Sequence, residues 1–111
     1  VAYVGIGAPN GNSLLRDSSI IKDAELQRLL DDGAVGDIAL RFLDVRGQPV
    51  RTDLDDRVIG ISLEDLKQVE RVVGVAGGVH KARVVHAALI GGLIDVLITD
   101  HLLAAALLDP D

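Results

Sequence analysis

A lysine at the start of a predicted helix is the residue whose position most suggests chemistry. Lys81 follows a strand-like run that ends at Ala76, then the pair Gly77 and Gly78, and it lies in the first turn of a helix predicted over Val79–Ile90. Helical spacing places Lys81 on the apolar side of that helix. A cation there costs desolvation free energy and opposes the helix dipole, which favours anions at this end. Such local conflicts tend to mark functional sites.

Two interpretations of Lys81 stay open. An anion such as a phosphate would satisfy both the lysine and the helix dipole, because Gly77 and Gly78 let backbone N–H groups approach a ligand closely. Alternatively, the Lys81 stem packs against the apolar side while its ammonium reaches the surface. The first interpretation predicts an anion site at this glycine turn.

Four further positions are candidates for ligand contact, and each also has a purely structural explanation. Asp100 precedes a helix and is first an N-cap candidate. Asp37 precedes a predicted strand, as a turn residue or as an acceptor for sugar hydroxyls. Gly5–Gly7 ends a strand, as a tight turn or as a loop near a ligand. Arg57 follows three aspartates, so a solvated ion pair is its ordinary explanation.

The histidines do not form a metal-ligating set. His80 and His86 lie six residues apart on a polar stripe with Arg83, which we expect to face water. Neither His80 nor His86 has a companion carboxylate at metal-binding spacing, and His101 does not complete a set with them. The chain also has no serine–histidine–acid constellation and no nucleophile elbow, so we expect no catalytic residue, no metal and no cofactor.

The elements that position these residues alternate along the chain. Strands are predicted over Val1–Ile6, Ile38–Val45, Arg57–Ile61, Arg71–Ala76 and Ile94–Thr99, and helices over Lys22–Gly33, Ser62–Leu66, Val79–Ile90 and Leu102–Leu108. We expect Ser62 to cap its helix, and a turn at Arg46–Pro49 with a return at Val50. This alternation predicts an α/β fold, a Rossmann-like, mostly parallel sheet flanked by helices. The carboxyl ends of its strands would open onto one crevice.

Composition narrows the class of protein. The 111 residues are 49% hydrophobic with one Phe, one Tyr and no Trp, so the core must be aliphatic, as in a sheet covered on both faces. The net charge of −6 argues against a surface for nucleic-acid backbones on this chain. The absence of cysteine excludes disulfides and fits a reducing, cytoplasmic setting. The strand pattern at the first residue and the absence of methionine predict a segment of a longer protein.

Several ordered motifs together resemble one family. The segments GAVGDIALRFLDVRGQPV, DDRVIGISLEDL and RVVGVAGGVHKARVVHAALIGGLIDVLITD, with VGIG near the start, resemble the C-terminal part of the SorC-type sugar-binding transcriptional regulators, within the DeoR-like sensor domains. The resemblance covers nearly the whole chain. It implies an incomplete effector domain similar in fold to sugar-phosphate isomerases and glucosamine-phosphate deaminases. A DNA-binding helix-turn-helix domain would lie outside residues 1–111.

The resemblance also implies roles for individual residues. Lys81 matches a lysine that holds an effector phosphate, and Gly77 and Gly78 match its glycine turn. Asp37 matches an acidic position near the sugar, and Arg57 matches a recurrent arginine that either touches ligand or braces its loop. The sequence departs from the family after Asp100, where it reads DHLLA, which indicates an altered contact there.

Three functions follow as hypotheses. The first is an effector-sensing domain of a homo-oligomeric, cytoplasmic regulator, which binds a phosphorylated sugar without turnover and couples it to DNA binding elsewhere. The second is an isomerase or deaminase-like enzyme on the same fold, which would need a positioned general base. The third is a purely structural oligomerisation unit, which would bind no ligand.

Overall fold

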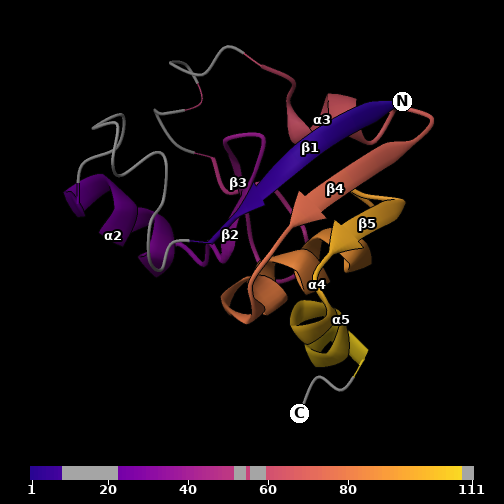
Figure 1. The fold of residues 1–111 in the computed structure, drawn as a ribbon. Coiled ribbons are helices and arrows are strands. Elements are labelled where there is room, and N and C mark those ends of the chain that lie inside the picture. The colour runs from indigo at the N-terminus through magenta and orange to yellow at the C-terminus, as the bar shows by residue number, and fades with distance from the viewer. Residues whose placement is uncertain (9–22, 52–54, 56–59, 109–111) are drawn as a thin grey trace.

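A computed structural model describes residues 1–8, 23–51, 55 and 60–108 as a five-stranded mixed sheet with helices (Figure 1). The strands lie in the order β3-β2-β1-β4-β5. Their bounds are Ala2–Gly7 (β1), Gly36–Ile38 (β2), Arg41–Leu43 (β3), Val72–Ala76 (β4) and Val96–Thr99 (β5). The helices are Asp23–Asp31 (α2), Leu63–Leu66 (α3), the 3₁₀ turn Val79–Lys81 (η2), Ala82–Ile90 (α4) and His101–Leu108 (α5).

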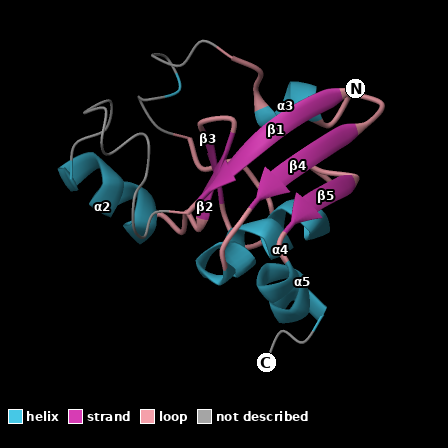
Figure 2. Cartoon of the chain, in the orientation of Figure 1, coloured by secondary structure: helices cyan, strands magenta, loops and turns pink. Residues whose placement is uncertain are grey.

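The parallel part of the sheet is where the sequence predicts it. β1, β4 and β5 run in one direction side by side, as Figure 2 shows. Val4 pairs with Gly74 and Gly74 with Leu97, which sets the register across the three strands. These strands are rich in β-branched residues, which suit a pleated, packed surface. Their carboxyl ends therefore lie at one edge of the sheet, as predicted.

The predicted single strand Ile38–Val45 is wrong. A two-residue turn at Ala39 and Leu40 splits this segment into the antiparallel strands β2 and β3. Both turn residues have left-handed backbone angles, with φ of 50° and 70°. The backbone N–H of Ala39 donates to the carbonyl oxygen of Gly5 at 3.1 Å, which ties the hairpin to β1. The hairpin adds an antiparallel extension to a parallel sheet.

The next turn follows the prediction. The Asp44 carboxylate accepts the backbone N–H groups of Arg46 and Gln48 at 2.9 and 3.0 Å, an arrangement that stabilises the reversal. The N–H of Val50 then donates to Phe42, so the chain returns beside β3. The predicted turn at Arg46–Pro49 is confirmed.

The short helix α3 begins where the sequence predicts it. Ser62 is the N-cap, and its hydroxyl oxygen accepts the N–H of Asp65 at 3.1 Å. Of the strand predicted over Arg57–Ile61, residues 57–59 lie outside the described residues, and Gly60 and Ile61 lie in a loop. The helix therefore follows a loop, at least from Gly60.

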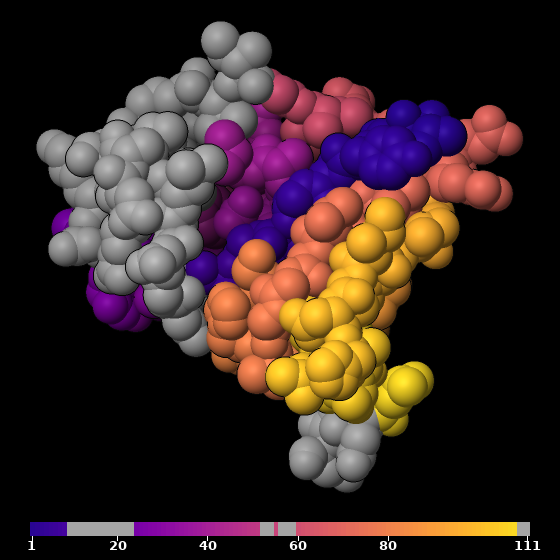
Figure 3. Space-filling view, in the orientation of Figure 1, coloured from indigo at the N-terminus to yellow at the C-terminus, as the bar shows by residue number. Residues whose placement is uncertain are grey.

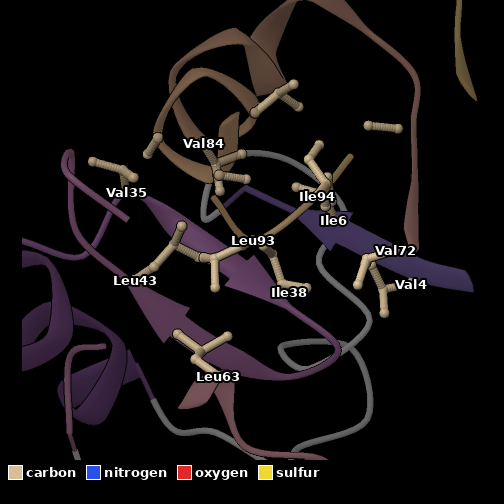
Figure 4. Close-up of a cluster of buried hydrophobic side chains, with 14 of the residues drawn as sticks. Val4, Ile6, Val35, Ile38, Leu43, Leu63, Val72, Val84, Leu93 and Ile94 are labelled. Carbon is tan, nitrogen blue, oxygen red and sulfur yellow. The ribbon is translucent and has the colours of Figure 1, made fainter. Parts of the chain in front are cut away.

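Two aliphatic clusters form the core. The larger one joins α4 to one face of the parallel strands and also includes side chains of the hairpin, α3 and α5. Figure 4 shows Val84 of α4 near Ile6 of β1 and near Ile94, which precedes β5. The smaller one packs α2 against β3 and the return at Val50, with Phe42 as its aromatic member. The aliphatic core predicted from composition is confirmed, and the larger cluster holds the strand ends in place.

Candidate functional site

The turn after β4 has a conformation that requires glycine. Gly78 takes φ 94° and ψ 132°, a backbone region that side-chain-bearing residues rarely adopt. The N–H of Lys81 donates to the carbonyl of Gly78 at 3.1 Å, which closes the 3₁₀ turn η2 before α4 begins. The predicted helix Val79–Ile90 is therefore a 3₁₀ turn followed by an α-helix. Its first N–H groups lie at the sheet edge where the strands end.

Asp100 connects this turn to the end of β5. One carboxylate oxygen accepts the N–H of Gly78 at 2.7 Å, and the other accepts the N–H of Leu103 at 2.8 Å. The second bond caps α5, which confirms the predicted capping role. Hydrogen bonds from Leu103 and Gly78 lower the pKa of Asp100, because they stabilise its charged form. The Asp100 carboxylate therefore links the glycine turn after β4 to the first turn of α5.

Sequence reasoning missed the bond from Asp100 to Gly78. It depends on the pairing of Ala76 with Thr99, which brings the residues after β4 and β5 together. The parallel alternation of the strands was a usable signal, because the ends of adjacent parallel strands meet at one edge. The Thr99 hydroxyl lies at this edge, buried and without a hydrogen-bond partner among the described residues.

Lys81 lies at the junction of η2 and α4, as the N-cap residue of α4. It is half-buried, while the valines one turn later, Val84 and Val85, are fully buried. Within the described residues no ion pair involves Lys81. The predicted placement of a lysine toward the packed side of this helix is therefore confirmed, and its ammonium lacks a bonded carboxylate in that part of the chain.

Asp37 lies close enough to Lys81 for their charges to interact. It belongs to β2 and is paired with Gly7 at the end of β1. Its carboxyl group lies over Gly7, where a Cβ atom would come within 2.5 Å of Oδ1. Burial raises the pKa of Asp37, while the N–H of Leu40, a donor at 3.2 Å, and the Lys81 charge act in the opposite direction. Burial is the largest of these effects.

The structure brings together most of the residues that the sequence singled out. Asp37, Gly7 and the Lys81 end of the glycine turn meet at the carboxyl ends of β1 and β4. Arg57 lies outside the described residues, so its predicted role stays a prediction. Chemically, the arrangement offers a cation at a helix start beside a half-buried carboxyl group. This combination suits a ligand that carries both an anionic group and hydroxyls.

The polar stripe predicted on α4 lies on the other side of the helix. His80, Arg83 and His86 are exposed and line a groove of about 440 Å³ between α4 and α5. Across the described residues, no cluster of three or more histidine, aspartate or glutamate side chains could hold a metal ion. The same residues contain no helix that is both long and apolar enough to span a bilayer.

A family model described as "Putative sugar-binding domain" matches residues 1–109. The chain belongs to this sugar-binding domain family of SorC- and DeoR-type transcriptional regulators. The SorC-type resemblance drawn from the motifs is thereby confirmed. The fold agrees with that of solved SorC- and DeoR-type sugar-binding domains, which confirms the predicted fold class.

Three relatives illustrate how much of a SorC-type regulator the chain represents. It is 40% identical to the transcriptional regulator LsrR of Klebsiella pneumoniae over 96% of this chain and 34% of LsrR. It superposes with a TM-score of 0.85 on a DeoR family transcriptional regulator from Listeria monocytogenes, with 38% identity over 93% of this chain and 42% of that one. The full-length sorbitol operon regulator SorC from Klebsiella pneumoniae gives 0.78, with 30% identity over 96% of this chain and 34% of that one. The chain spans about a third of the curated relative's length.

Proposed function

We propose that this SorC-type chain is part of one effector domain and that it senses a phosphorylated sugar. The observation that carries the proposal is the position of Lys81. The residue is half-buried at the start of α4, its ammonium has no ion-pair partner among the described residues, and its charge is within reach of the Asp37 charge. An anion at this point would compensate both the lysine and the helix dipole.

The glycine turn supplies the backbone part of the proposed phosphate site. Gly77 and Gly78 bring the chain close to the ligand without side chains in the way. Since Asp100 accepts the Gly78 N–H, and the N–H groups of Lys81 and Ala82 donate within the turn, we assign the phosphate to the N–H groups of Val79 and His80 at the start of η2. Lys81 then provides the positive charge that the phosphate needs, and Asp100 holds the turn in the conformation that binds it.

Asp37 is proposed as the acceptor for a sugar hydroxyl. Its Oδ2 accepts the Leu40 N–H, which restrains the carboxyl group, and the Lys81 charge is close enough to act on it. A half-buried carboxylate that accepts hydroxyl groups gives directional recognition of a sugar. Arg57 is proposed as a further ligand contact or as a brace for its own loop.

The proposed domain transmits ligand binding and does not turn the ligand over. The matched relatives are transcriptional regulators, so the DNA-binding helix-turn-helix domain is assigned to another part of a homo-oligomeric, cytoplasmic protein. The enzyme alternative needs a general base with an acid partner. Asp100 does not suit either role, because both of its oxygens accept backbone N–H groups. Effector binding would shift the equilibrium between arrangements of the subunits.

Calorimetric titration of the intact regulator tests this proposal. A panel of phosphorylated sugars and their unphosphorylated parents is titrated into the wild type, Lys81→Ala and the control Lys67→Ala, whose side chain is exposed at the end of α3. One phosphorylated sugar should bind tightly. Lys81→Ala should weaken it by about 10- to 100-fold, since a charge-assisted hydrogen bond contributes about 1.5–3 kcal/mol. Lys67→Ala should bind as the wild type does.

Binding that is indifferent to the phosphate group or to Lys81 would show that the turn is not a phosphate site. Turnover of the bound sugar phosphate, followed by product analysis, would instead favour the isomerase or deaminase alternative. If no sugar in the panel binds the intact protein, the sensing function itself is contradicted, and the purely structural hypothesis gains support.

A further inference from the structure

The groove between α4 and α5 concentrates nitrogen donors in a chain that is acidic overall. Figure 1 shows α4 beside α5, and Figure 3 shows the orange segment that contains η2 and α4 adjoining the yellow α5 in the lower part of the view. His80, Arg83 and His86 line the groove. Residues 79–90 and 101–108 contain no aspartate or glutamate, although the chain has 17 acidic and 11 basic residues. The positive charge of the groove is therefore not offset by any carboxylate of these two helices.

The three donor side chains have no bonded partner in the part of the chain that the structure describes. His80, Arg83 and His86 take part there in no ion pair and no side-chain hydrogen bond. The carboxylate of Asp100 reaches the adjacent Gly78, but both of its oxygens already accept backbone N–H groups. The donors of the groove are therefore available to a ligand.

The floor of the groove is apolar. Ala82, Ala106 and Leu107 line it and are half-buried, and Ala82 and Leu107 also pack against the larger core cluster. Two of these three residues are alanines, whose short side chains leave room between the helices. The ring of His80 lies against Gly78, where a Cβ atom would come within 2.6 Å of its Cε1, so one end of the groove lies at the glycine turn. An apolar hollow with a few polar groups beside it is the usual composition of a small-molecule site.

We propose that this groove is a second binding site, for an organic acid with an apolar body. The planar guanidinium of Arg83 can bind a carboxylate through two parallel hydrogen bonds, and the histidines add donors beside it. A volume of about 440 Å³ lies within the range of about 300–1,000 Å³ typical of ligand pockets, and the apolar floor fits an aromatic or branched hydrocarbon. The described residues that line the groove include no side-chain oxygen, so the groove does not suit the hydroxyl groups of a sugar.

This second site goes beyond the sugar-phosphate proposal and does not rest on it. Lys81 is half-buried toward the packed side of the segment, whereas His80, Arg83 and His86 are exposed. The two sites share η2, because His80 and Lys81 are consecutive residues there. Ligands at both sites would therefore change each other's affinity wherever one of them shifts η2.

Ligand-observed NMR on the intact regulator tests the site with a matched pair of probes. The probe 2-naphthoate has a carboxylate on an apolar body, and 2-naphthamide has nearly the same shape without the charge. Dissociation constants are measured for the wild type, Arg83→Gln and the control Arg71→Gln, an exposed arginine before β4 with no ion pair among the described residues. A further variant, Ala106→Leu, enlarges a side chain of the groove floor. Urea unfolding verifies that each variant is folded.

The wild type should bind 2-naphthoate more tightly than 2-naphthamide. Arg83→Gln should weaken 2-naphthoate by about 3- to 10-fold, as expected for a charged hydrogen bond at a partly exposed site, and should leave 2-naphthamide unchanged. Arg71→Gln should change neither dissociation constant. Ala106→Leu should weaken both probes, because the larger side chain occupies the groove.

Three results would overturn the inference. The first is equal affinity of the two probes for the wild type, or equal affinity of Arg83→Gln and the wild type for 2-naphthoate. The second is the absence of 2-naphthoate binding by the wild type, which would show that other polypeptide of the intact protein fills the groove. The third is a loss in Lys81→Ala as large as that in Arg83→Gln, which would place the probe in the proposed sugar-phosphate site.

Discussion

Asp37 and Lys81 are placed at a cost to the folded state. Burial raises the pKa of Asp37, which means that the folded protein holds its charged form less well than water does. Lys81 opposes the dipole of α4 at its N-cap position. Residues in such positions are tolerated where another requirement, such as ligand binding, outweighs stability.

Replacing Asp37 by asparagine should separate stability from binding. The pKa of Asp37 is raised above 3.8, so the folded state binds more protons than the unfolded state once the pH exceeds that value. Stability is therefore lost as the pH rises through the interval between 3.8 and the native pKa, and the penalty is complete above it. Asp37→Asn removes this penalty and should raise the urea midpoint of the intact protein at pH 7, while sugar-phosphate binding weakens.

The matched control is Asp32→Asn, which makes the same chemical change at an exposed position after α2. Its midpoint should stay near that of the wild type at every pH. The advantage of Asp37→Asn over this control should shrink as the pH approaches 4. An advantage that is independent of pH would show that the burial of the Asp37 charge is not its cause.

Substitution by alanine should destabilise the protein much more at Gly78 than at Gly77. Gly78 has φ 94°, where a side chain costs about 1–2 kcal/mol, and a Cβ there would also meet the ring of His80. A Cβ on Gly77 would make an ordinary contact of 3.5 Å with Asp100. Urea unfolding should therefore show a loss of about 1–2 kcal/mol or more for Gly78→Ala and a much smaller change for Gly77→Ala. Equal losses would contradict the backbone explanation.

Among the elements, the β2–β3 hairpin departs most from the sequence-based expectation. Its turn residues, Ala39 and Leu40, are not the glycine or asparagine that two-residue turns with positive φ favour. The run from Ile38 to Val45 is otherwise typical of one continuous strand, so no local signal marked the reversal. Of the bonds that fix it, the one from Ala39 to Gly5 is tertiary, whereas the one from Leu40 to Asp37 spans only three residues.

Glycine at position 39 should stabilise the protein. Ala39 has φ 50°, so Ala39→Gly relieves a left-handed alanine, and we expect a gain of about 0.5–1 kcal/mol in the free energy of unfolding. The control Ala105→Gly makes the same change on the exposed side of α5 and should cost about 0.5–1 kcal/mol. Chemical denaturation measures both. Losses of similar size in both variants would show that the turn is not strained.

Arg41 on β3 bonds to the segment before α3, and sequence reasoning did not find these bonds. Its guanidinium donates to the carbonyl oxygens of Asp55, Gly60 and Ile61 at 3.2, 3.0 and 3.1 Å, and it forms an ion pair with Asp55. The side chain is only 15% exposed. These partners lie up to 20 residues away, so no local sequence pattern predicts these contacts.

Arg41→Lys should lose most of these bonds, because an ammonium cannot reproduce the planar fork of a guanidinium. We expect a loss of about 1–3 kcal/mol in unfolding free energy, measured by urea titration. Arg51→Lys is the control, since the Arg51–Glu64 pair is exposed and should change stability by less than about 1 kcal/mol. A neutral result for Arg41→Lys would show that Arg41 does not hold the loop.

At the scale of the whole molecule, the net charge predicts that this chain does not bind DNA. The net charge of −6 argues against the binding of a nucleic-acid backbone by this chain. The isolated effector domain should therefore show no operator binding by fluorescence anisotropy at physiological salt, while the intact regulator binds. Tight binding by the isolated domain would contradict the assignment of DNA recognition to another part of the protein.

The parallel strands, the glycine turn and Lys81 were predictable, because each depends on local spacing and on conflicts visible within a few residues. The hairpin, the Arg41 contacts and the bond from Asp100 to Gly78 were not, because each joins segments that meet only in the folded sheet. The same holds for the packed face of the parallel strands. Alternation within β1 shows two faces, but only the structure shows which face α4 packs against.

The carboxylate of Asp100 also has a kinetic consequence. Because it accepts the N–H groups of both Gly78 and Leu103, these two amide protons are released to solvent by the same local opening. They should exchange with deuterium at similar rates, although one follows β4 and the other lies in the first turn of α5. A ligand held at the glycine turn should then slow exchange at Leu103, a position it never touches, and so report occupancy at the first turn of α5.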